Sequence, residues 1–408
     1  MFKTPFQGHA HMYKRTISTI SLILLGIVCI LTMGAQSAPK EFRGIWVITW
    51  EIYAPSGTIL KQEKLKKRIE TILDNVKLAG LNAVLWQVRQ NGTVYYPAKN
   101  EPWGKYLEYK DPGFDPVEFA LEQAHKRGLE FHAWFNTFEA FDRNVSTVSV
   151  RHPEWIARDK ENKPMPKLTC LSPGIPKVRE YLVKVVSEFV SKYQTDGIHM
   201  DYIRWNEYRW SDMENPLERN LVDSGFGEFL FDREHPYEHG IPQGFSTWES
   251  WRRDAVTKFV ASLGKAIKLI RPTVRLSVAA IGKYNWGIWN GYHAVFQDAA
   301  LWLNQGLIDQ IMAMNYAWTD AVKMYDGLAG KCPECWLDFI TQGLERGGQF
   351  SAGIGSMTLD NRDLWENHGE IVKSVRSAQF TSGFQFFSYG AWEKKNYFSR
   401  AKDELGLD

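Results

Sequence analysis

The 408-residue sequence contains few cysteines. Apart from Cys29, which lies in a hydrophobic N-terminal run, they are Cys170, Cys332 and Cys335. Three thiols cannot build a disulfide-rich scaffold, so a hydrophobic core must stabilise the fold. Cys332 and Cys335 belong to a CPEC motif, and no second CxxC pair is present to complete a four-ligand zinc site. The motif therefore predicts a local disulfide at the entry to a helix.

The sequence also carries little net charge. The formal value is +2, and the first 38 residues contribute Lys3, Lys14 and Arg15 without any acid, which leaves −1 for the remainder. A near-neutral chain without a block of basic residues argues against a nucleic-acid partner.

The motifs of several enzyme classes are absent. There is no GxSxG elbow for a serine nucleophile and no HExxH pair for a metal. No GxGxxG phosphate loop follows the first predicted strand. We therefore expect no cofactor, no metal ion and no serine chemistry.

One long hydrophobic run is present, over residues 17–33. Lys14 and Arg15 precede it and small residues up to Ala38 follow it, an order typical of a secretory signal peptide. We predict a cleaved signal over residues 1–38 and an exported protein, periplasmic or extracellular. The alternative is an uncleaved anchor, because the run approaches the ~20 residues that span a bilayer; membrane contact is expected through this segment alone.

Aromatic residues are abundant, with 17 Trp, 17 Tyr and 23 Phe. Core packing rarely needs so many tryptophans, whereas flat aromatic faces offer stacking surfaces to a ligand. The composition therefore favours a sugar-binding protein, with a large core as the plainer explanation.

Eight β-branched or aromatic runs alternate with helical patterns along residues 39–408. Helix ends are expected at Gly80 and Gly128, and first turns near Pro116 and Pro176. Eight strands, each followed by a helix, predict a single (β/α)8 TIM barrel as the fold. A doubly wound open sheet is the alternative, but it would usually contain fewer strands. The predicted strands are 42–49, 82–89, 130–137, 197–205, 274–282, 308–316, 350–356 and 380–390.

Long segments follow the second, third and fourth predicted strands, over 91–115, 138–175 and 206–247. The returns from helix to strand are short. Because barrel enzymes build their active sites from strand-to-helix loops, this asymmetry predicts a wide cleft suited to a polymer or a bulky ligand.

Asp201 lies near the end of the fourth predicted strand, where side chains of alternate residues point into the barrel mouth. Burying a carboxylate there is costly unless it is paired or used. We predict that Asp201 acts as a nucleophile or stabilises an oxocarbenium-like transition state. The alternative is a structural ion pair with Arg89 or Arg204.

Glycoside hydrolysis requires a second carboxyl group. The candidates are Glu139 and Asp142 after the third predicted strand, Glu51 after the first, Glu207 after the fourth and Asp320 after the sixth, and we rank Glu139, Glu207 and Asp320 first. The sequence does not choose among these three, and each is open to being an ordinary solvated loop acid.

The same alternation suggests residues that bind substrate. Tryptophans near strand ends are stacking platforms or packing residues, and Trp50 is a further example. The two histidines are binding groups or hydrogen-bonded core residues, and a metal site with Asp201 is a weaker alternative without supporting spacing. The predicted substrate-binding residues are Gln87, Arg89, His132, Trp134, Asn136, His199, Arg204, Trp205, Asn315, Tyr316 and Trp318.

A series of segments in preserved order resembles the glycosyl-hydrolase-10-like family, a group of exported bacterial barrels. The resemblance covers nearly all of the chain beyond the signal. The matching segments are RGIWV (43–47), LNAVLWQVR (81–89), YYPAKNEPW (95–103), DPGFDPVEFALEQAHKRGLEFHAWFN (111–136), HPEW (152–155), SPGIPKVREYL (172–182), DGIHMDYIRW (196–205) and WRRDAVTKFV (251–260).

The resemblance implies a (β/α)8 barrel with glycosidase activity in the bacterial envelope, where some relatives act on peptidoglycan glycan strands. Asp201 matches the aspartate that closes the fourth strand of the family. Many members carry a second aspartate at the next position, where this chain has Tyr202, so a mechanism based on adjacent carboxylates does not carry over. An aspartate nucleophile at this strand is similar to that of α-galactosidase barrels.

Taken together, these observations predict a secreted glycoside hydrolase that cleaves O-glycosidic bonds in a cell-envelope or extracellular glycan polymer. The alternative is a carbohydrate-binding barrel without catalysis, which would bind glycans and release no reducing ends. A metal-dependent hydrolase, which a chelator would inactivate, is a third hypothesis. The oligomeric state is left open.

Overall fold

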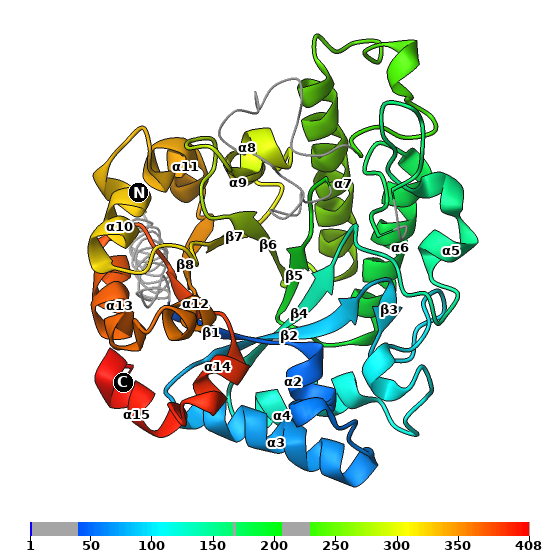
Figure 1. Ribbon diagram of the computed structural model, residues 1–408. Helices are drawn as coiled ribbons and strands as arrows, with labels where there is room; N and C mark the ends of the chain where they lie inside the picture. Colours follow the sequence, from blue (N-terminus) through cyan, green and yellow to red (C-terminus); the bar gives the residue numbers. More distant parts are fainter. Residues whose placement is uncertain (2–39, 166–168, 206–228, 408) are drawn as a thin grey trace. The chain divides into compact units, whose positions relative to one another are not determined.

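Eight parallel strands close into a barrel in the computed structural model, which describes Met1 and residues 40–165, 169–205 and 229–407. Each strand pairs in parallel with the next, and the last strand pairs with the first (Figure 1). The expected (β/α)8 TIM barrel is thereby confirmed. The strands are β1 (Phe42–Val47), β2 (Ala83–Gln90), β4 (Glu130–Asn136), β5 (Gly197–Asp201), β6 (Arg275–Ile281), β7 (Gln310–Met314), β8 (Gln349–Ile354) and β9 (Gly383–Phe386).

Two details of the strands differ from the sequence expectation. A short strand, β3 (Thr93–Val94), adds antiparallel to β2 in the segment that follows it. The fourth barrel strand ends at Asp201 rather than at residue 205, because Tyr202 adopts a φ of 47° and leaves the extended conformation. The end of β5 therefore places Asp201 at the barrel rim.

Helices surround the strands (Figure 1). Pro116 and Pro176 stand at helix starts, and Gly80 and Gly128 have positive φ just after helix ends, as predicted. The helices are α2 (Thr49–Tyr53), α3 (Gln62–Leu78), α4 (Pro116–Lys126), α5 (Val148–Arg151), α6 (Pro176–Lys192), α7 (Trp248–Ile270), α8 (Gly291–Ala294), α9 (Ala299–Asn304), α10 (Ala321–Tyr325), α11 (Trp336–Glu345), α12 (Ser356–Asn361), α13 (His368–Ser377), α14 (Tyr389–Lys394) and α15 (Phe398–Leu405).

The barrel interior is a packed core. Trp46 of β1 contacts Trp134 of β4 and His199 of β5 edge to face, each with ring centroids 4.6 Å apart. Apolar residues of neighbouring strands, including Leu85 and Met312, complete the cluster. This cluster fills the interior of the barrel. The polar residues therefore lie in the layer above it, at the mouth where the strands end.

The strand-to-helix segments after β2, β4 and β5 are long, as expected. They contain β3 in the first and the short helix α5 in the second, before α4, α6 and α7 begin. Part of the third, 206–228, lies outside the described residues.

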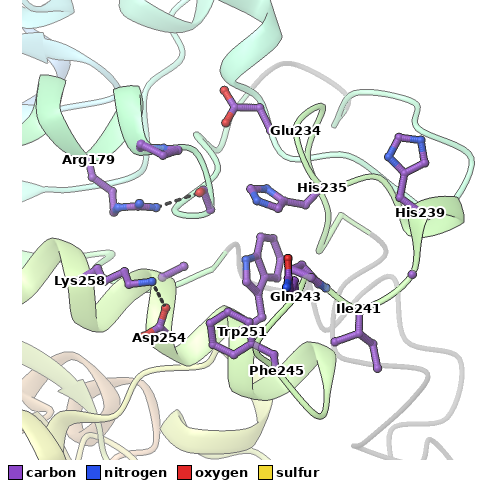
Figure 2. Close-up of a pocket in the computed structure, with 15 residues that line it drawn as sticks. Arg179, Glu234, His235, His239, Ile241, Gln243, Phe245, Trp251, Asp254 and Lys258 are labelled. Atoms are coloured by element: carbon purple, nitrogen blue, oxygen red, sulfur yellow. Dashed lines mark hydrogen bonds and ion pairs between the residues drawn. The ribbon is translucent and has the colours of Figure 1, made fainter.

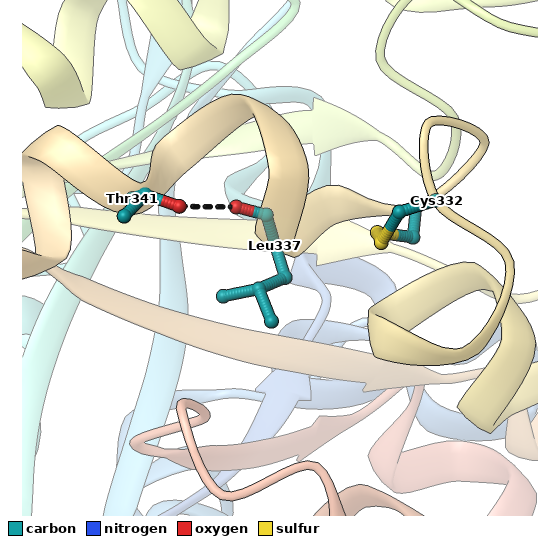
Figure 3. Close-up of a disulfide and its surroundings, with 4 residues drawn as sticks. Cys332, Leu337 and Thr341 are labelled. Carbon is teal, nitrogen blue, oxygen red and sulfur yellow. Dashed lines mark hydrogen bonds between the residues drawn. A yellow bond between two sulfur atoms is a disulfide. The ribbon is translucent and has the colours of Figure 1, made fainter.

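Cys332 and Cys335 form a disulfide directly before α11 (Figure 3), as the CPEC motif predicted. Within α11, Thr341 donates its hydroxyl to the carbonyl of Leu337 at 2.9 Å. The disulfide closes a short loop at the entry of this helix.

Residues from Phe42 onward form one compact unit, separate from Met1–Glu41. The predicted signal peptide, 1–38, and its hydrophobic run lie almost wholly outside the described residues, so the boundary between signal and barrel domain stays a prediction. Within the described ranges, every helix is too short or too polar to cross a lipid bilayer.

Candidate functional site

A row of polar side chains lies at the carboxyl ends of neighbouring strands. Asn136, the last residue of β4, stands in register with Asp201, the last residue of β5. Asn136 Oδ1 accepts from Gln87 Nε2 at 3.2 Å, and Asn136 Nδ2 donates to Glu139 Oε2 at 2.7 Å. Asn136 is thus a common neighbour of Asp201 and Glu139, two of the carboxyl groups predicted to be catalytic.

Asp201 is 6% exposed. Its Oδ1 accepts a hydrogen bond from the backbone N–H of Tyr202 at 2.7 Å and another from Arg204 Nη1 at 3.3 Å. The ion pair with Arg204, one alternative for Asp201, is therefore present, and it offsets part of the cost of burying the carboxylate. These bonds orient the carboxylate at the mouth.

Tyr316, two residues beyond β7, carries a buried hydroxyl with no hydrogen-bond partner among the described residues. Its ring stacks on Phe387 at 4.9 Å. Burial, and then the negative charge of Asp201, raise the pKa of Tyr316 well above its usual value. The hydroxyl therefore keeps its proton near Asp201 and is available as a donor, which is uncommon for a buried polar group.

The side of the mouth formed by β6 and β7 holds a cavity of about 600 Å³. Ile281 and Met314, the last residues of β6 and β7, line it together with the half-buried tryptophans Trp289 and Trp318. Asn315 joins the lining and is fixed by donating its Nδ2 to the carbonyl of Gly282 at 2.9 Å. Aromatic faces beside an oriented amide are suited to bind the apolar face and the hydroxyls of a sugar.

Arg89 does not line the mouth, contrary to its predicted binding role. The β2–β4 register shifts between Gln87 and Arg89, so strict alternation fails there. The guanidinium instead forms a buried two-fold ion pair with Glu101, both bonds at 2.7 Å. It also donates to the carbonyls of Thr137 and Glu139. Arg89 therefore holds the segments after β2 and β4 together.

The two histidines lie below the mouth. His132 is fully buried near the start of β4, where its Nε2 pairs with Glu130 Oε2 at 3.0 Å. His199 is fully buried in the middle layer, with Nδ1 bonded to Ser277 Oγ at 2.9 Å. Burial lowers the pKa of both rings, that of His199 well below its usual value. They are core histidines, and neither reaches the position expected for a hydroxyl-binding group.

The predicted tryptophans separate into packing and exposed residues. Trp205 is fully buried, donates Nε1 to the carbonyl of Arg252 and packs on Trp251. Trp134 is buried beneath the polar row. Neither presents a face to solvent, whereas Trp318 lines the cavity and Trp50 is 42% exposed on α2.

Of the candidates for the second carboxyl group, Asp320 has a structural role and Glu207 is not tested by the structure. Asp320 caps α10, accepting from the backbone N–H of Lys323 at 2.9 Å and pairing with the Lys323 ammonium. These contacts lower its pKa, so Asp320 is a helix cap rather than a proton donor. Glu207 lies outside the described residues. Glu139 is the described candidate that the structure brings to the polar row.

Glu51, the candidate carboxyl group after the first strand that the sequence ranks below the other three, is buried on α2. Its Oε1 accepts from Ser388 Oγ at 2.6 Å and from the N–H of Gly390 at 2.8 Å, and its Oε2 accepts from the N–H of Ile48 at 2.9 Å. Burial outweighs these bonds and raises the pKa of Glu51 to about 7. Its place after the first strand is visible in the sequence, but its burial and its contacts are not, because two of its three partners lie at the other end of the chain.

The described residues contain no cluster of three or more His, Cys, Asp or Glu side chains that could hold a metal ion. At the mouth, the described residues offer carboxyl groups, amides, a tyrosine and aromatic faces.

The sequence model of the family described as "Glycosyl hydrolase-like 10" matches residues 41–329. The chain belongs to this family. Its relatives include the glycosyl hydrolase YngK of Bacillus subtilis (strain 168), 28% identical over 97% of this chain and 77% of YngK. The glycosyl hydrolase DigH of Escherichia coli (strain K12) is 27% identical over 75% of this chain and 71% of DigH.

Among solved structures, the glycoside hydrolase domain of PgaB (BpsB) from Bordetella bronchiseptica is similar to this chain with a TM-score of 0.55 and 13% identity. The match covers 89% of this chain and 99% of that domain. At this identity the likeness concerns the fold alone. Family and fold together support a glycosidase-type function for this glycosyl-hydrolase-like-10 protein.

Proposed function

We propose that this protein is an exported glycoside hydrolase that cleaves O-glycosidic bonds within a glycan polymer of the cell envelope or its surroundings. The observation that carries the proposal is the polar row, in which Asn136 adjoins Asp201 in register and donates to Glu139. Two carboxyl groups beside one amide, at the catalytic end of a barrel, are the groups that glycoside hydrolysis requires.

In this mechanism Asp201 attacks or stabilises the sugar carbon as positive charge develops. Its orientation by Arg204 and the N–H of Tyr202 keeps the carboxylate in place. Glu139, whose Oε2 accepts a hydrogen bond from Asn136, donates a proton to the leaving oxygen as its bond to the sugar carbon breaks. A water molecule then adds to that carbon and returns a proton to a carboxylate of the site. The separation of the two carboxyl groups would then set the stereochemistry, at ~5–5.5 Å for retention and ~6.5–9.5 Å for inversion.

The remaining groups of the mouth would position the sugar. Gln87 and Asn136 offer amides, and Tyr316 offers a hydroxyl donor without a partner among the described residues. Trp289 and Trp318 offer faces in the cavity beside β6 and β7. A sugar ring could stack on that side while its glycosidic oxygen faces the carboxyl groups.

The second candidate function is carbohydrate binding without catalysis. The ion pair between Arg204 and Asp201 favours it, because a carboxylate that is structurally paired need not react. Reducing-end release from a panel of purified polysaccharides, including peptide-free peptidoglycan strands, separates the two functions. Cleavage supports the hydrolase, and saturable binding without new reducing ends supports the binding protein.

Export is part of the same proposal and rests on residues 17–33 and the preceding basic pair. We expect the mature chain to begin near Ala38 or Pro39, as read by mass spectrometry of the native protein. An intact hydrophobic run on a membrane-bound form would instead support the anchor.

A further inference from the structure

A second cavity, of about 670 Å³, lies outside the barrel between the first turns of α6 and α7 (Figure 2). Helices of this fold run antiparallel to the strands, so these first turns lie at the same end of the barrel as the mouth. Trp251 of α7 lines the cavity and packs on Trp205 with ring centroids 5.3 Å apart. Trp205 follows Asp201 by four residues, whereas Asp201, Asn136 and Glu139 do not line the cavity.

One wall of the cavity is Arg179 of α6. Its Nη1 donates to the carbonyls of Pro173 and Gly174 at 2.6 and 2.8 Å, which fixes the side chain. Among the described residues, no carboxylate forms an ion pair with Arg179, although Asp254 and Asp232 lie near enough to act on its charge. Figure 2 shows the guanidinium directed toward the central space, across from His235.

The opposite wall is organised by a buried carboxylate. Asp232 is fully buried and accepts from Ser172 Oγ at 2.7 Å and from the backbone N–H of His235 at 2.8 Å. Its Oδ1 also lies 2.9 Å from His235 Nδ1, and the His235 ring packs on Trp251 at 4.8 Å. The imidazole is thus held in one orientation, as expected for a built binding site.

The rim adds apolar and polar groups. Ile241 is 43% exposed and Phe245 is half-buried beside the exposed Gln243. Asp254 and Lys258 line the lower side and pair with one another at 2.7 Å (Figure 2). Aromatic and aliphatic faces therefore alternate with planar hydrogen-bonding groups.

The charges of the lining nearly balance, because Arg179 and Lys258 are matched by Glu234 and Asp254. A strongly anionic ligand is therefore not favoured. A ligand with many hydroxyls and apolar ring faces satisfies both kinds of lining group, and the volume lies within the ~300–1,000 Å³ typical of small-ligand sites.

We propose that this cavity is an accessory glycan-binding site, which holds a segment of the polymer away from the bond that is cleaved. The inference rests on the proposed function for its substrate class. Two sites on one molecule raise affinity for a long chain that reaches both, while a short chain gains nothing.

The test compares long peptide-free peptidoglycan glycan strands with a tetrasaccharide released from them. The double variant Gln243→Ala/Phe245→Ala removes rim contacts, and Gln243→Trp fills the cavity from an exposed position if the first variant folds poorly. Leu269→Ala, 76% exposed at the far end of α7, is the matched control. We expect KM for long strands to rise about tenfold, with kcat/KM for the tetrasaccharide unchanged.

Equal effects on both substrates, or an unchanged KM on long strands, would overturn the accessory site. Co-sedimentation of long strands with the Asp201→Asn protein separates this outcome from failure of the proposed function. Strands retained by that protein but released by the cavity variants support the site even when no glycan is cleaved. If neither the wild-type nor the Asp201→Asn protein retains any strand, the accessory site for this polymer fails, whereas the proposed function is decided separately by reducing-end release from the polysaccharide panel.

Discussion

The two halves of the barrel mouth differ in chemistry. On the side of β2, β4 and β5, Asn136 and Asp201 end their strands and Gln87 lies three residues before the end of β2, and these polar groups bond to neighbours. On the side of β6 and β7, Ile281 and Met314 occupy the corresponding layer and face a cavity with two tryptophans. Buried polar groups need partners within reach, so they cluster on adjacent strands. The arrangement leaves the other half free to bind the apolar faces of a sugar.

The largest effect is expected when the polar half loses its charge. Asp201→Asn keeps the size of the side chain and can still accept from Tyr202 N–H, but it removes the carboxylate. If that carboxylate attacks or stabilises the sugar carbon, kcat should fall ~10³-fold or more, because each 1.36 kcal/mol of barrier is a factor of ten. Turnover and thermal midpoint are measured on one preparation.

The same substitution distinguishes catalysis from structure. If Asp201 serves only as the ion-pair partner of Arg204, the variant should lose stability, because a buried guanidinium is left without its partner, while most of the activity survives. That outcome would remove Asp201 from the catalytic residues.

The loops of the polar half should depend on the buried pair of Arg89 and Glu101. Glu101→Gln leaves the guanidinium without its counter-charge, which should lower the free energy of unfolding by ~3–5 kcal/mol. Urea denaturation measures it. Glu108→Gln, in the exposed pair with Lys61, is the control and should leave the urea midpoint unchanged. Equal midpoints for the two variants would contradict a structural role for Arg89.

Glu51 lies outside these two halves, in the segment after β1 that contacts the segment after β9, and it should make stability depend on pH. Its pKa is raised from 4.5 to about 7 in the folded protein, so the folded state binds more protons between these values. The free energy of unfolding should therefore fall as pH rises through this window, by roughly 3 kcal/mol in total.

Denaturant unfolding at a series of pH values from 4 to 8 measures this slope. Glu51→Gln cannot ionise and should flatten it, whereas Glu63→Gln, with an exposed side chain, should not. A wild-type slope that persists in Glu51→Gln would assign the pH dependence to other groups.

The smallest effect concerns the apolar half. Trp289→Ala or Trp318→Ala should raise KM about tenfold, since one lost stacking contact costs on the order of 1 kcal/mol or slightly more, with little change in kcat. The phenylalanine variants should restore most of the affinity. A fall in kcat without a change in KM would place these rings in the reaction rather than in binding.

The fold and the centre of the polar row could be predicted from the sequence. β-Branched and aromatic runs mark all eight barrel strands, and the alternation of side chains correctly places Asn136 and Asp201 at the mouth. These signals are local, because each depends only on the residues of its own strand.

Alternation fails at Arg89, because the register shift next to it is produced by contacts with β4 that the sequence of β2 does not reveal. The alternation of side chains also does not indicate how far from the mouth a residue lies along the barrel axis. His132 therefore faces the interior as predicted but lies too far from the mouth. The sequence around Asp320 indicates a structural role rather than a catalytic one, because an aspartate directly before a helix is a preferred N-cap.

The contacts of Glu51 have a consequence for how the barrel assembles. Glu51 and Ser388 are 337 residues apart in the sequence. Their hydrogen bond joins the segment after β1 to the segment after β9, beside the pairing of these two strands that closes the barrel. Contacts of such separation carry the greatest loop-closure cost. We therefore expect the contact between these two segments to form last during folding and to break first during unfolding. A rise in pH, which ionises Glu51, should then weaken the barrel at the β1–β9 pairing.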